Sequence, residues 1–328
     1  MMTFHKDVLK IDPAAVTEEL VVSLRRDVRQ TFHRSGAVVG ISGGVDSSVA
    51  LALCVRAFGS KRVVGVMMPE KDCSRDSIVL ARKVAEQFGI ETVIEDMTGA
   101  LVGFGCYDRR DEAIRRVFPE YDPSYGAKIT LPQNVLDSDA LNVFHLTIIT
   151  PEGEEKSKRP NLRDYLQIVA ASNFKQRSRM TMLYYHAELR NYAVVGTPNK
   201  NEHDQGFFVK WGDGGYDVAP IRHLFKTQVY QLAEYLEVPQ EIRQATPTTD
   251  TYSAHSSQEE FFFRLPFEVM DLLWYAQEHN VPVAEVAQVM GLTEEQVRRA
   301  SSDFERKRRT TEYLRMAPIG YGDGPLNR

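Results

Sequence analysis

The chain has 328 residues, of which 45 are acidic and 40 are basic, so its formal charge of -5 supplies no global attraction to nucleic acid. Hydrophobic residues at 43% and charged residues at 26% are ordinary for a globular protein and argue against wholesale disorder. The sequence lacks both the ~18-residue apolar run of a membrane helix and the apolar stretch of a secretion signal, so we expect a cytoplasmic protein without a membrane partner. Cys54, Cys73 and Cys106 have neither disulfide-frame nor zinc-site spacing, and we expect them to be reduced.

The first hundred residues alternate between helical and strand patterns. Apolar residues recur at helical spacing over about 14–34, which predicts an amphipathic helix. Short apolar runs rich in β-branched residues, typical of buried parallel strands, follow at 37–41, 63–68 and 91–97. Helical patterns separate these runs at 49–58 and 74–88. This alternation predicts a doubly wound α/β fold, in which a parallel sheet carries helices on both faces.

Residues 103–161 break this alternation. The stretch carries charge clusters, several prolines and an alternating segment at 141–149, which ends in the turn-like Pro151-Glu152-Gly153. It predicts a central insertion with hairpin character. Helical patterns then lie at about 165–191, 226–236 and 266–279, with a strand pattern at 192–196. Because no long polar linker divides the chain, we predict a single domain, 1–328, with a C-terminal helical segment at about 266–316.

A glycine pair lies between the first predicted strand and the next helix, in Ser42-Gly43-Gly44-Val45-Asp46-Ser47-Ser48. Glycines let the backbone approach an anion closely, and the helix start behind them offers unpaired N–H groups and a positive dipole end. Asp46 places a carboxylate in this anion site, which makes sense if Mg²⁺ bridges it to phosphate oxygens. The loop lacks the Gly-Lys-Ser/Thr ending of the Walker type. Its Ser-Gly-Gly-x-Asp-Ser pattern resembles the ATP pyrophosphatase superfamily, which cleaves ATP between the α and β phosphates and adenylates a substrate oxygen.

Later blocks resemble the ammonia-dependent NAD synthetases within that superfamily. They occur in the family's order and lie at 173–180, 196–202, 206–217, 224–226 and 247–250. The block at 206–217, which reads GFFVKWGDGGYD, closely matches the family's glycine-rich loop. The resemblance extends over about 14–271 with a gap for the insertion, and it implies an adenine nucleotide alpha hydrolase-like fold.

The side chains in these blocks suit adenylation chemistry. Glu202, after a short strand and loop, can supply a second carboxylate for magnesium. Lys210 and Lys226 are single positive charges in loop contexts, where an ammonium group can contact phosphate as a point charge. Arg177 and Arg179 lie two apart near the expected start of a basic helix, so we expect only one of them to face the cleft.

The resemblance also implies roles by position. ATP is expected to contact the phosphate loop and three later side chains, namely Gly40, Ile41, Ser42, Gly43, Gly44, Val45, Asp46, Ser47, Thr197, Lys226 and Thr248. The implied deamido-NAD contacts are Arg177, Lys210 and Asp217, with Asp217 at the nicotinate end or the ribose. Asp46 and Lys210 are the implied catalytic residues, and Asp46 and Glu202 are the implied magnesium ligands.

These features predict an enzyme that amidates deamido-NAD with ammonia and ATP. The substrate carboxylate attacks the α phosphorus and gives an acyl-adenylate and pyrophosphate, after which ammonia displaces AMP. Positioning and charge neutralisation supply the acceleration in such a transfer, so no side-chain nucleophile is required. About forty residues precede the loop, too few for a glutaminase domain, and we expect ammonia to be free or delivered by a separate protein. The resemblance further implies a homodimer.

Some features favour other functions. The family carries a His-Lys pair near its C-terminus that contacts deamido-NAD, whereas this chain has Tyr313-Leu314 there. The alternative is an amide-forming ligase of the same family that acts on a different carboxylic acid, or a nucleotide-binding regulator without turnover. Residues 283–300 have helix-turn-helix-like spacing before the basic run 306–309, but we favour packing of these helices on the core over DNA binding. A histidine metal site is disfavoured by the irregular spacing of His203, His223 and His255.

Overall fold

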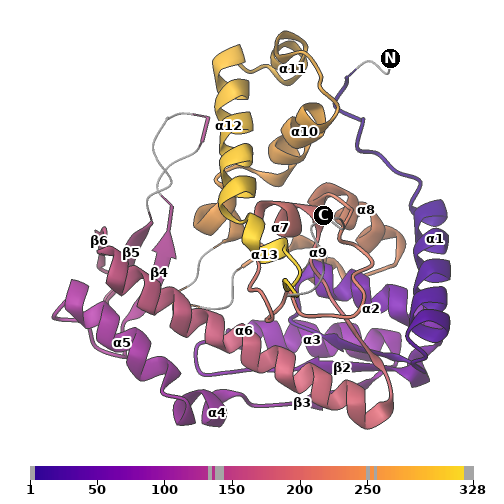
Figure 1. The fold of residues 1–328 in the computed structure, drawn as a ribbon, viewed down its shortest axis with the longest axis horizontal. Coiled ribbons are helices and arrows are strands. Elements are labelled where there is room, and N and C mark those ends of the chain that lie inside the picture. The colour runs from indigo at the N-terminus through magenta and orange to yellow at the C-terminus, as the bar shows by residue number, and fades with distance from the viewer. Residues whose placement is uncertain (1–3, 132–134, 137–143, 249–251, 255–256, 321–328) are drawn as a thin grey trace.

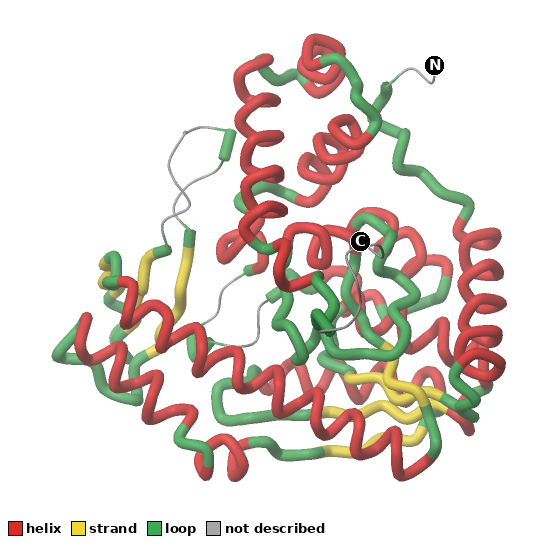
Figure 2. Tube along the Cα trace, in the orientation of Figure 1, coloured by secondary structure: helices red, strands yellow, loops and turns green. Residues whose placement is uncertain are grey.

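A four-stranded parallel sheet forms the base of the molecule (Figures 1 and 2). The computed structural model describes residues 4–131, 135–136, 144–248, 252–254 and 257–320. The strands of this sheet are β1 (Ala37–Gly40), β2 (Val63–Met67), β3 (Glu91–Ile94) and β7 (Ala193–Val195), in the order β3-β2-β1-β7. Because every neighbouring pair is parallel, the carboxyl ends of the four strands meet at one edge of the sheet.

Helices make up most of the remaining described structure. Their bounds are α1 (Pro13–Arg25), α2 (Val45–Phe58), α3 (Arg75–Phe88), α4 (Thr98–Gly103), α5 (Cys106–Val117), α6 (Leu162–Arg190), α7 (Lys200–Gln205), α8 (Lys226–Tyr235), α9 (Gln240–Gln244), α10 (Phe267–Glu278), α11 (Val283–Met290), α12 (Glu294–Thr310) and α13 (Glu312–Arg315). Short irregular helices lie at η1 (Arg26–Thr31), η2 (Ser60–Arg62) and η3 (Glu259–Phe263). None of the helices within the described ranges combines the length and apolar character of a membrane span.

The two faces of the sheet are covered by different helices, so the predicted doubly wound fold is confirmed. Side chains alternate along β1, and Ala37 and Val39 pack in one apolar cluster with residues of α1, α2 and α8. Val38 faces the other way and packs with Ala187 and Leu183 of α6. Figure 1 shows α6 as a long helix that crosses in front of the strands. The site is therefore built above a sheet that is apolar on both faces.

A second, three-stranded antiparallel sheet lies in the predicted insertion. Its strands are β4 (Gly126–Thr130), β5 (His145–Ile149) and β6 (Glu155–Lys158), and the turn between β5 and β6 confirms the predicted hairpin character. Residues 141–143 of the predicted alternating segment lie outside the described residues. The same stretch also contains a helix that the sequence pattern did not indicate, α5 at 106–117. Two buried positions of α5 are charged, Arg110 and Asp111, and these charges hide its apolar periodicity.

The last helices pack together on one side of the molecule (Figure 1). Phe4 and Leu9 from the N-terminal segment complete their apolar core, and the Phe4 N–H donates a hydrogen bond to Glu285 Oε1 at 3.0 Å. In the segment with helix-turn-helix-like spacing, Val286 and Val297 are buried in this same core. Lys307, within the basic run, is also buried and pairs with Asp303. This packing opposes the DNA-binding hypothesis, which needs an exposed helix and a basic face.

Candidate active site

A cavity of about 1650 Å³ opens at the carboxyl edge of the parallel sheet. Its wall includes the phosphate loop, the loop after β2, one side of α6, the glycine-rich loop at 206–215 and the start of α13. Pockets for a single small ligand typically enclose about 300–1,000 Å³. The cavity is therefore large enough for two nucleotide-sized ligands side by side.

The phosphate loop connects β1 to the N-terminus of α2. Gly44 is the N-cap of α2, and the hydroxyl groups of Ser47 and Ser48 donate hydrogen bonds to its carbonyl oxygen at 3.0 and 2.9 Å. Gly43 has a φ of +82°, and a Cβ there would lie 2.5 Å from the Ser77 carbonyl oxygen in the first turn of α3. A glycine is therefore required both by the backbone conformation and by the close approach of α3.

Asp46 lies in the first turn of α2 and forms the centre of a polar cluster at the cavity. Its Oδ1 accepts a hydrogen bond from Asn199 Nδ2 at 3.0 Å, and its Oδ2 contacts Lys226 Nζ. Glu202 of α7 accepts hydrogen bonds from the Asn199 N–H at 3.1 Å and from Gln258 Nε2 at 3.2 Å. Segments that are far apart in the sequence thus bring two carboxylates and one ammonium group together.

The electrostatics of this cluster favour binding of a cation. Desolvation and the negative charge of Asp46 raise the pKa of Glu202 to about 8. Burial alone would lower the pKa of Lys226, but Asp46 and Glu202 outweigh burial and raise it. A divalent cation between Asp46 and Glu202 would relieve their repulsion, and Mg²⁺ typically takes one or two carboxylates together with phosphate oxygens and water. The donor set fits magnesium.

No larger metal cluster is present in the described ranges, where no three His, Cys, Asp or Glu side chains converge on a common point. Of the three histidines considered from the sequence, His203 and His223 belong to the described part of the chain, and His255 lies outside it.

The structure brings nearly all of the predicted site residues to one cavity. The cavity is lined by Gly40, Ile41, Ser42, Gly43, Gly44, Val45, Asp46, Ser47, Arg177, Thr197, Glu202, Lys210, Lys226 and Thr248. Asp217 is not among the described residues that line this cavity. Its Oδ2 accepts a hydrogen bond from the Val194 N–H at 2.8 Å, and its Oδ1 accepts one from the Tyr184 hydroxyl at 3.1 Å, so its carboxylate is occupied beside β7.

The two arginines of α6 correct a further expectation. Both Arg177 and Arg179 line the cavity, and they lie within a helix that begins at Leu162, far from its start. Arg177 Nε donates to the Lys210 carbonyl oxygen at 3.2 Å, whereas Arg179 Nε donates to the Met68 carbonyl oxygen at 3.3 Å. Both side chains are long enough to reach the cavity although their positions lie two residues apart on the helix.

Lys210 is held by the C-terminal segment. Its Nζ donates hydrogen bonds to the carbonyl oxygens of Tyr313 at 2.9 Å and Met316 at 2.8 Å. The rings of Trp211 and Tyr313 lie 5.8 and 5.7 Å from the same ammonium group. Tyr313 and Leu314 line the cavity, so the departure from the family pattern lies in the wall of the site.

Three polar residues of the site were not assigned a role from the sequence. Asn199 and Gln258 hold Glu202, and Asp213 lines the cavity from the glycine-rich loop, where it accepts the Val209 N–H at 2.7 Å. Asn199 and Glu202 form a capping box, an Asn followed by Glu three residues later, and this signature was available in the sequence. Gln258 had no such local signal.

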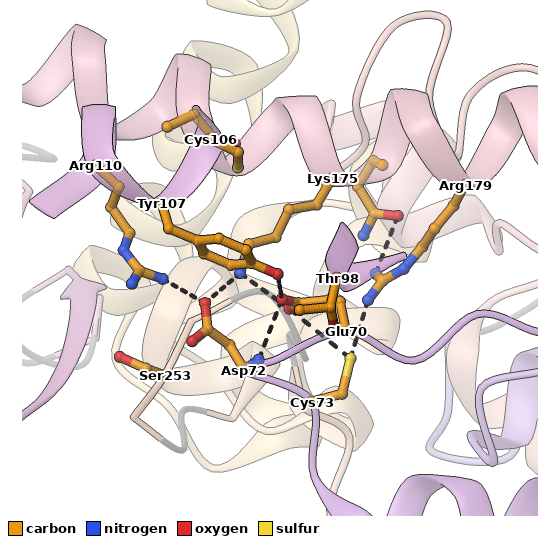
Figure 3. Close-up of polar contacts among 12 residues, drawn as sticks. Glu70, Asp72, Cys73, Thr98, Cys106, Tyr107, Arg110, Lys175, Arg179 and Ser253 are labelled. Carbon is orange, nitrogen blue, oxygen red and sulfur yellow. Dashed lines mark hydrogen bonds and ion pairs between the residues drawn. The ribbon is translucent and has the colours of Figure 1, made fainter. Parts of the chain in front are cut away.

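A buried cluster of charged groups fixes the loop after β2 (Figure 3). Lys175 of α6 is 1% exposed and pairs with Glu70 at 2.9 Å and with Asp72 at 2.5 Å. From α5, the Tyr107 hydroxyl donates to Glu70 Oε2 at 2.6 Å, and Arg110 pairs with Asp72. Positive charges on Lys175 and Arg110 lower the pKa of Asp72 although burial opposes this. The same loop leads into α3, so the cluster braces the wall behind the phosphate loop.

Comparisons with known proteins place the chain in a family. A family model described as NAD synthase matches residues 16–113 and 139–318. The NH3-dependent NAD(+) synthetase of Mesorhizobium japonicum is 51% identical over 311 residues, with 95% of this chain and 97% of that protein covered. The enzyme of the same name from Rhizobium meliloti is 47% identical, with 97% and 94% covered. This chain belongs to the NAD synthase family.

Solved structures agree in fold. The NH3-dependent NAD synthetase from Campylobacter jejuni, in complex with the nitrate ion, has a TM-score of 0.61 at 20% identity, and 95% of this chain and all of that chain are covered. At this level of identity the likeness shows the shared fold. The doubly wound sheet is therefore the common framework.

We expect Gly43→Ala to disrupt the phosphate loop. The added Cβ would clash with Ser77 in addition to the strain of a positive φ, and strained backbone of this kind costs about 1–3 kcal/mol. Thermal unfolding and ATP binding by calorimetry would measure the effect. Gly59→Ala is the matched control, because Gly59 has a φ of +81° with open space around its Cβ position. Equal losses in the two variants would contradict the role of close packing.

Replacing Lys175 by Met is expected to destabilise the protein by about 3–5 kcal/mol, because it leaves Glu70 and Asp72 buried without their ammonium partner. Urea unfolding measures the change. Lys156→Met is the control, since Lys156 pairs with Glu120 on an exposed surface and should cost no more than about 1 kcal/mol. A similar small change in both variants would show that the cluster does not brace the loop.

Proposed function

We propose that this protein is a ligase that amidates deamido-NAD to NAD with ammonia while it cleaves ATP to AMP and pyrophosphate. Membership of the NAD synthase family supports the reaction. The single observation that carries it is the placement of Asp46, in the phosphate loop, close to Glu202 in the wall of a cavity of about 1650 Å³. A cavity of that size accommodates both a nucleoside triphosphate and a dinucleotide.

ATP is assigned to the half of the cavity beside the parallel sheet. The loop from Gly40 to Ser47 offers backbone N–H groups to its phosphates, and Thr197, just after β7, and Thr248 line the same cavity as further contacts. Lys226 supplies a fixed positive charge next to Asp46. Asp46 and Glu202 would hold magnesium, which would neutralise phosphate charge.

The acid substrate is assigned to the half of the cavity beside α6. Arg177 and Lys210 suit its pyrophosphate, and Lys210 lies at the junction of the glycine-rich loop and the C-terminal segment. Asp217 stays a predicted contact of this substrate. In the structure its carboxylate accepts a hydrogen bond from the β7 backbone instead. A substrate carboxylate oxygen attacks the α phosphorus as pyrophosphate leaves. Ammonia then attacks the acyl carbon, loses a proton and displaces AMP.

The partners and location follow from the same assignment. We propose a cytoplasmic enzyme that takes ammonia free or from a separate glutaminase. We also propose a homodimer, and α6 supports this part because Leu162 and Leu166 near its start and Tyr185 and Leu189 near its end are each more than half exposed. Large apolar side chains along one helix suit contact with a second copy.

The central test is pyrophosphate release with ATP, magnesium and ammonia, using deamido-NAD and a panel of other carboxylic acids. We expect release with deamido-NAD and a loss of about 10²–10³-fold in Asp46→Asn, because the carboxylate that holds the cation is gone. Thermal unfolding of the variant shows whether it is folded. Release with a different acid in place of deamido-NAD would favour the alternative ligase, and absence of release with every acid would favour a nucleotide-binding regulator.

Magnesium binding is expected to strengthen as the pH rises toward 8. Glu202 has its pKa raised to about 8, so below that pH magnesium must displace a proton, and the affinity should rise about tenfold per pH unit. The dependence should level off above pH 8, where Glu202 is already ionised. Calorimetric titration of Mg²⁺ at pH 6.5 and 8.5 measures it. Glu202→Gln should bind weakly at both pH values, and an unchanged pH dependence in that variant would exclude Glu202 as the ligand.

A further inference from the structure

Asp271 of α10 is completely buried although the proposed reaction gives it no role. Its Oδ1 accepts a hydrogen bond from Asn201 Nδ2, and its Oδ2 accepts one from the Thr227 N–H at 2.8 Å. Asn201 Oδ1 in turn accepts the Lys226 N–H at 3.1 Å. Burial raises the pKa of Asp271 to about 6. A buried carboxyl group is unfavourable unless it is hydrogen-bonded, and here all its partners belong to the site-bearing elements α7 and α8.

These bonds secure the first turn of α8. Lys226 and Thr227 are its first two residues, and N–H groups at that position have no acceptor within a helix. The preceding residue is Phe225, whose side chain has no oxygen with which to cap the helix. Asp271 and Asn201 supply the missing acceptors from two other elements. A carboxylate also interacts favourably with the positive end of the helix dipole.

The same face of α10 contacts the Lys226 side chain. Phe267 lies one turn before Asp271, and its ring is 5.4 Å from Lys226 Nζ. That ammonium group contacts Asp46 Oδ2, and Asn201 is the neighbour of Glu202 in α7. From α10, Asp271 thus holds the backbone N–H of the residue after Lys226, and Phe267 contacts the charged end of Lys226. Through Asn201, which accepts the Lys226 N–H, α10 is also connected to the second carboxylate.

We infer that Asp271 is a positioning residue for adenylation, which holds α7 and α8 in the register that brings Lys226 to Asp46. This inference rests on the proposed function. Asp271 touches neither substrate, so its loss should reduce the rate of the chemical step and leave binding of deamido-NAD unchanged. A displacement of about 1 Å in a catalytic group can cost about 10²-fold in rate.

The Asp271–Asn201 pair allows a test by exchange. In Asp271→Asn, an amide that keeps the Thr227 bond turns its NH₂ group toward Asn201 Nδ2, so two donors face each other. In Asn201→Asp, two carboxylates face each other. The double variant Asn201→Asp/Asp271→Asn reverses the direction of the bond between the two side chains and retains all three hydrogen bonds. The exchange therefore restores the geometry without restoring the original residues.

The experiment measures kcat, the KM of deamido-NAD and the unfolding temperature for the wild type and the three variants. Each single variant should lose about 10- to 100-fold in kcat with KM unchanged, and the double variant should regain about tenfold or more. Leu273→Ala is the control for general destabilisation, since Leu273 is a buried apolar residue on the same helix. It should lower the unfolding temperature and leave kcat unchanged.

Two results would overturn this inference. One is a double variant no faster than the single variants, including the case in which neither folds. The other is a loss of kcat in Leu273→Ala that matches the loss in Asp271→Asn. Absence of pyrophosphate release by the wild type would instead refute the proposed function, so the two failures are distinguishable.

Discussion

The contact between Lys226 and Asp46 is the interaction on which the rest of the site depends. It joins the phosphate loop to a helix that begins 180 residues later in the chain. Neither group is favourable to bury alone, and each stays in place because the other neutralises it. Because Lys226 neutralises Asp46, the negative charge that remains in the cluster is that of Glu202. One positive charge is built into the protein, and the second carboxylate, Glu202, is left to attract a cation.

The charge of the cavity differs from the charge of the chain. The whole chain carries a formal charge of -5, yet the cavity wall contains more basic than acidic residues. The basic residues are Lys71, Arg177, Arg179, Lys210, Lys226, Arg306 and Lys307, and the acidic residues are Asp46, Asp72, Asp76, Glu202 and Asp213. Local concentration of positive charge suits a chain of negative net charge to the binding of anionic nucleotides.

The sequence was most informative where the chemistry is local. The phosphate loop was predictable because strand, glycine pair and helix follow one another directly, and the family blocks identified Thr197, Glu202 and Lys226. The buried charges of α5 and α6 could not be predicted, because Arg110 and Lys175 look like solvated residues until distant carboxylates surround them. Asp217 shows the converse case: the family block predicted a role at the substrate. In the structure its carboxylate accepts a hydrogen bond from the β7 backbone, and this contact depends on tertiary packing that the sequence does not reveal.

The buried cluster gives the insertion a connection to catalysis. The family model finds no match for 114–138, so this stretch departs from what the family shares. Just before it, α5 sends Tyr107 and Arg110 into the loop after β2, and that loop continues into α3, whose Ser77 carbonyl oxygen approaches Gly43. Close-packed side chains have low compressibility, so a displacement of one group is transmitted to its neighbours. The region around the insertion therefore supports the wall of the cavity, so a change in α5 should reach the phosphate loop.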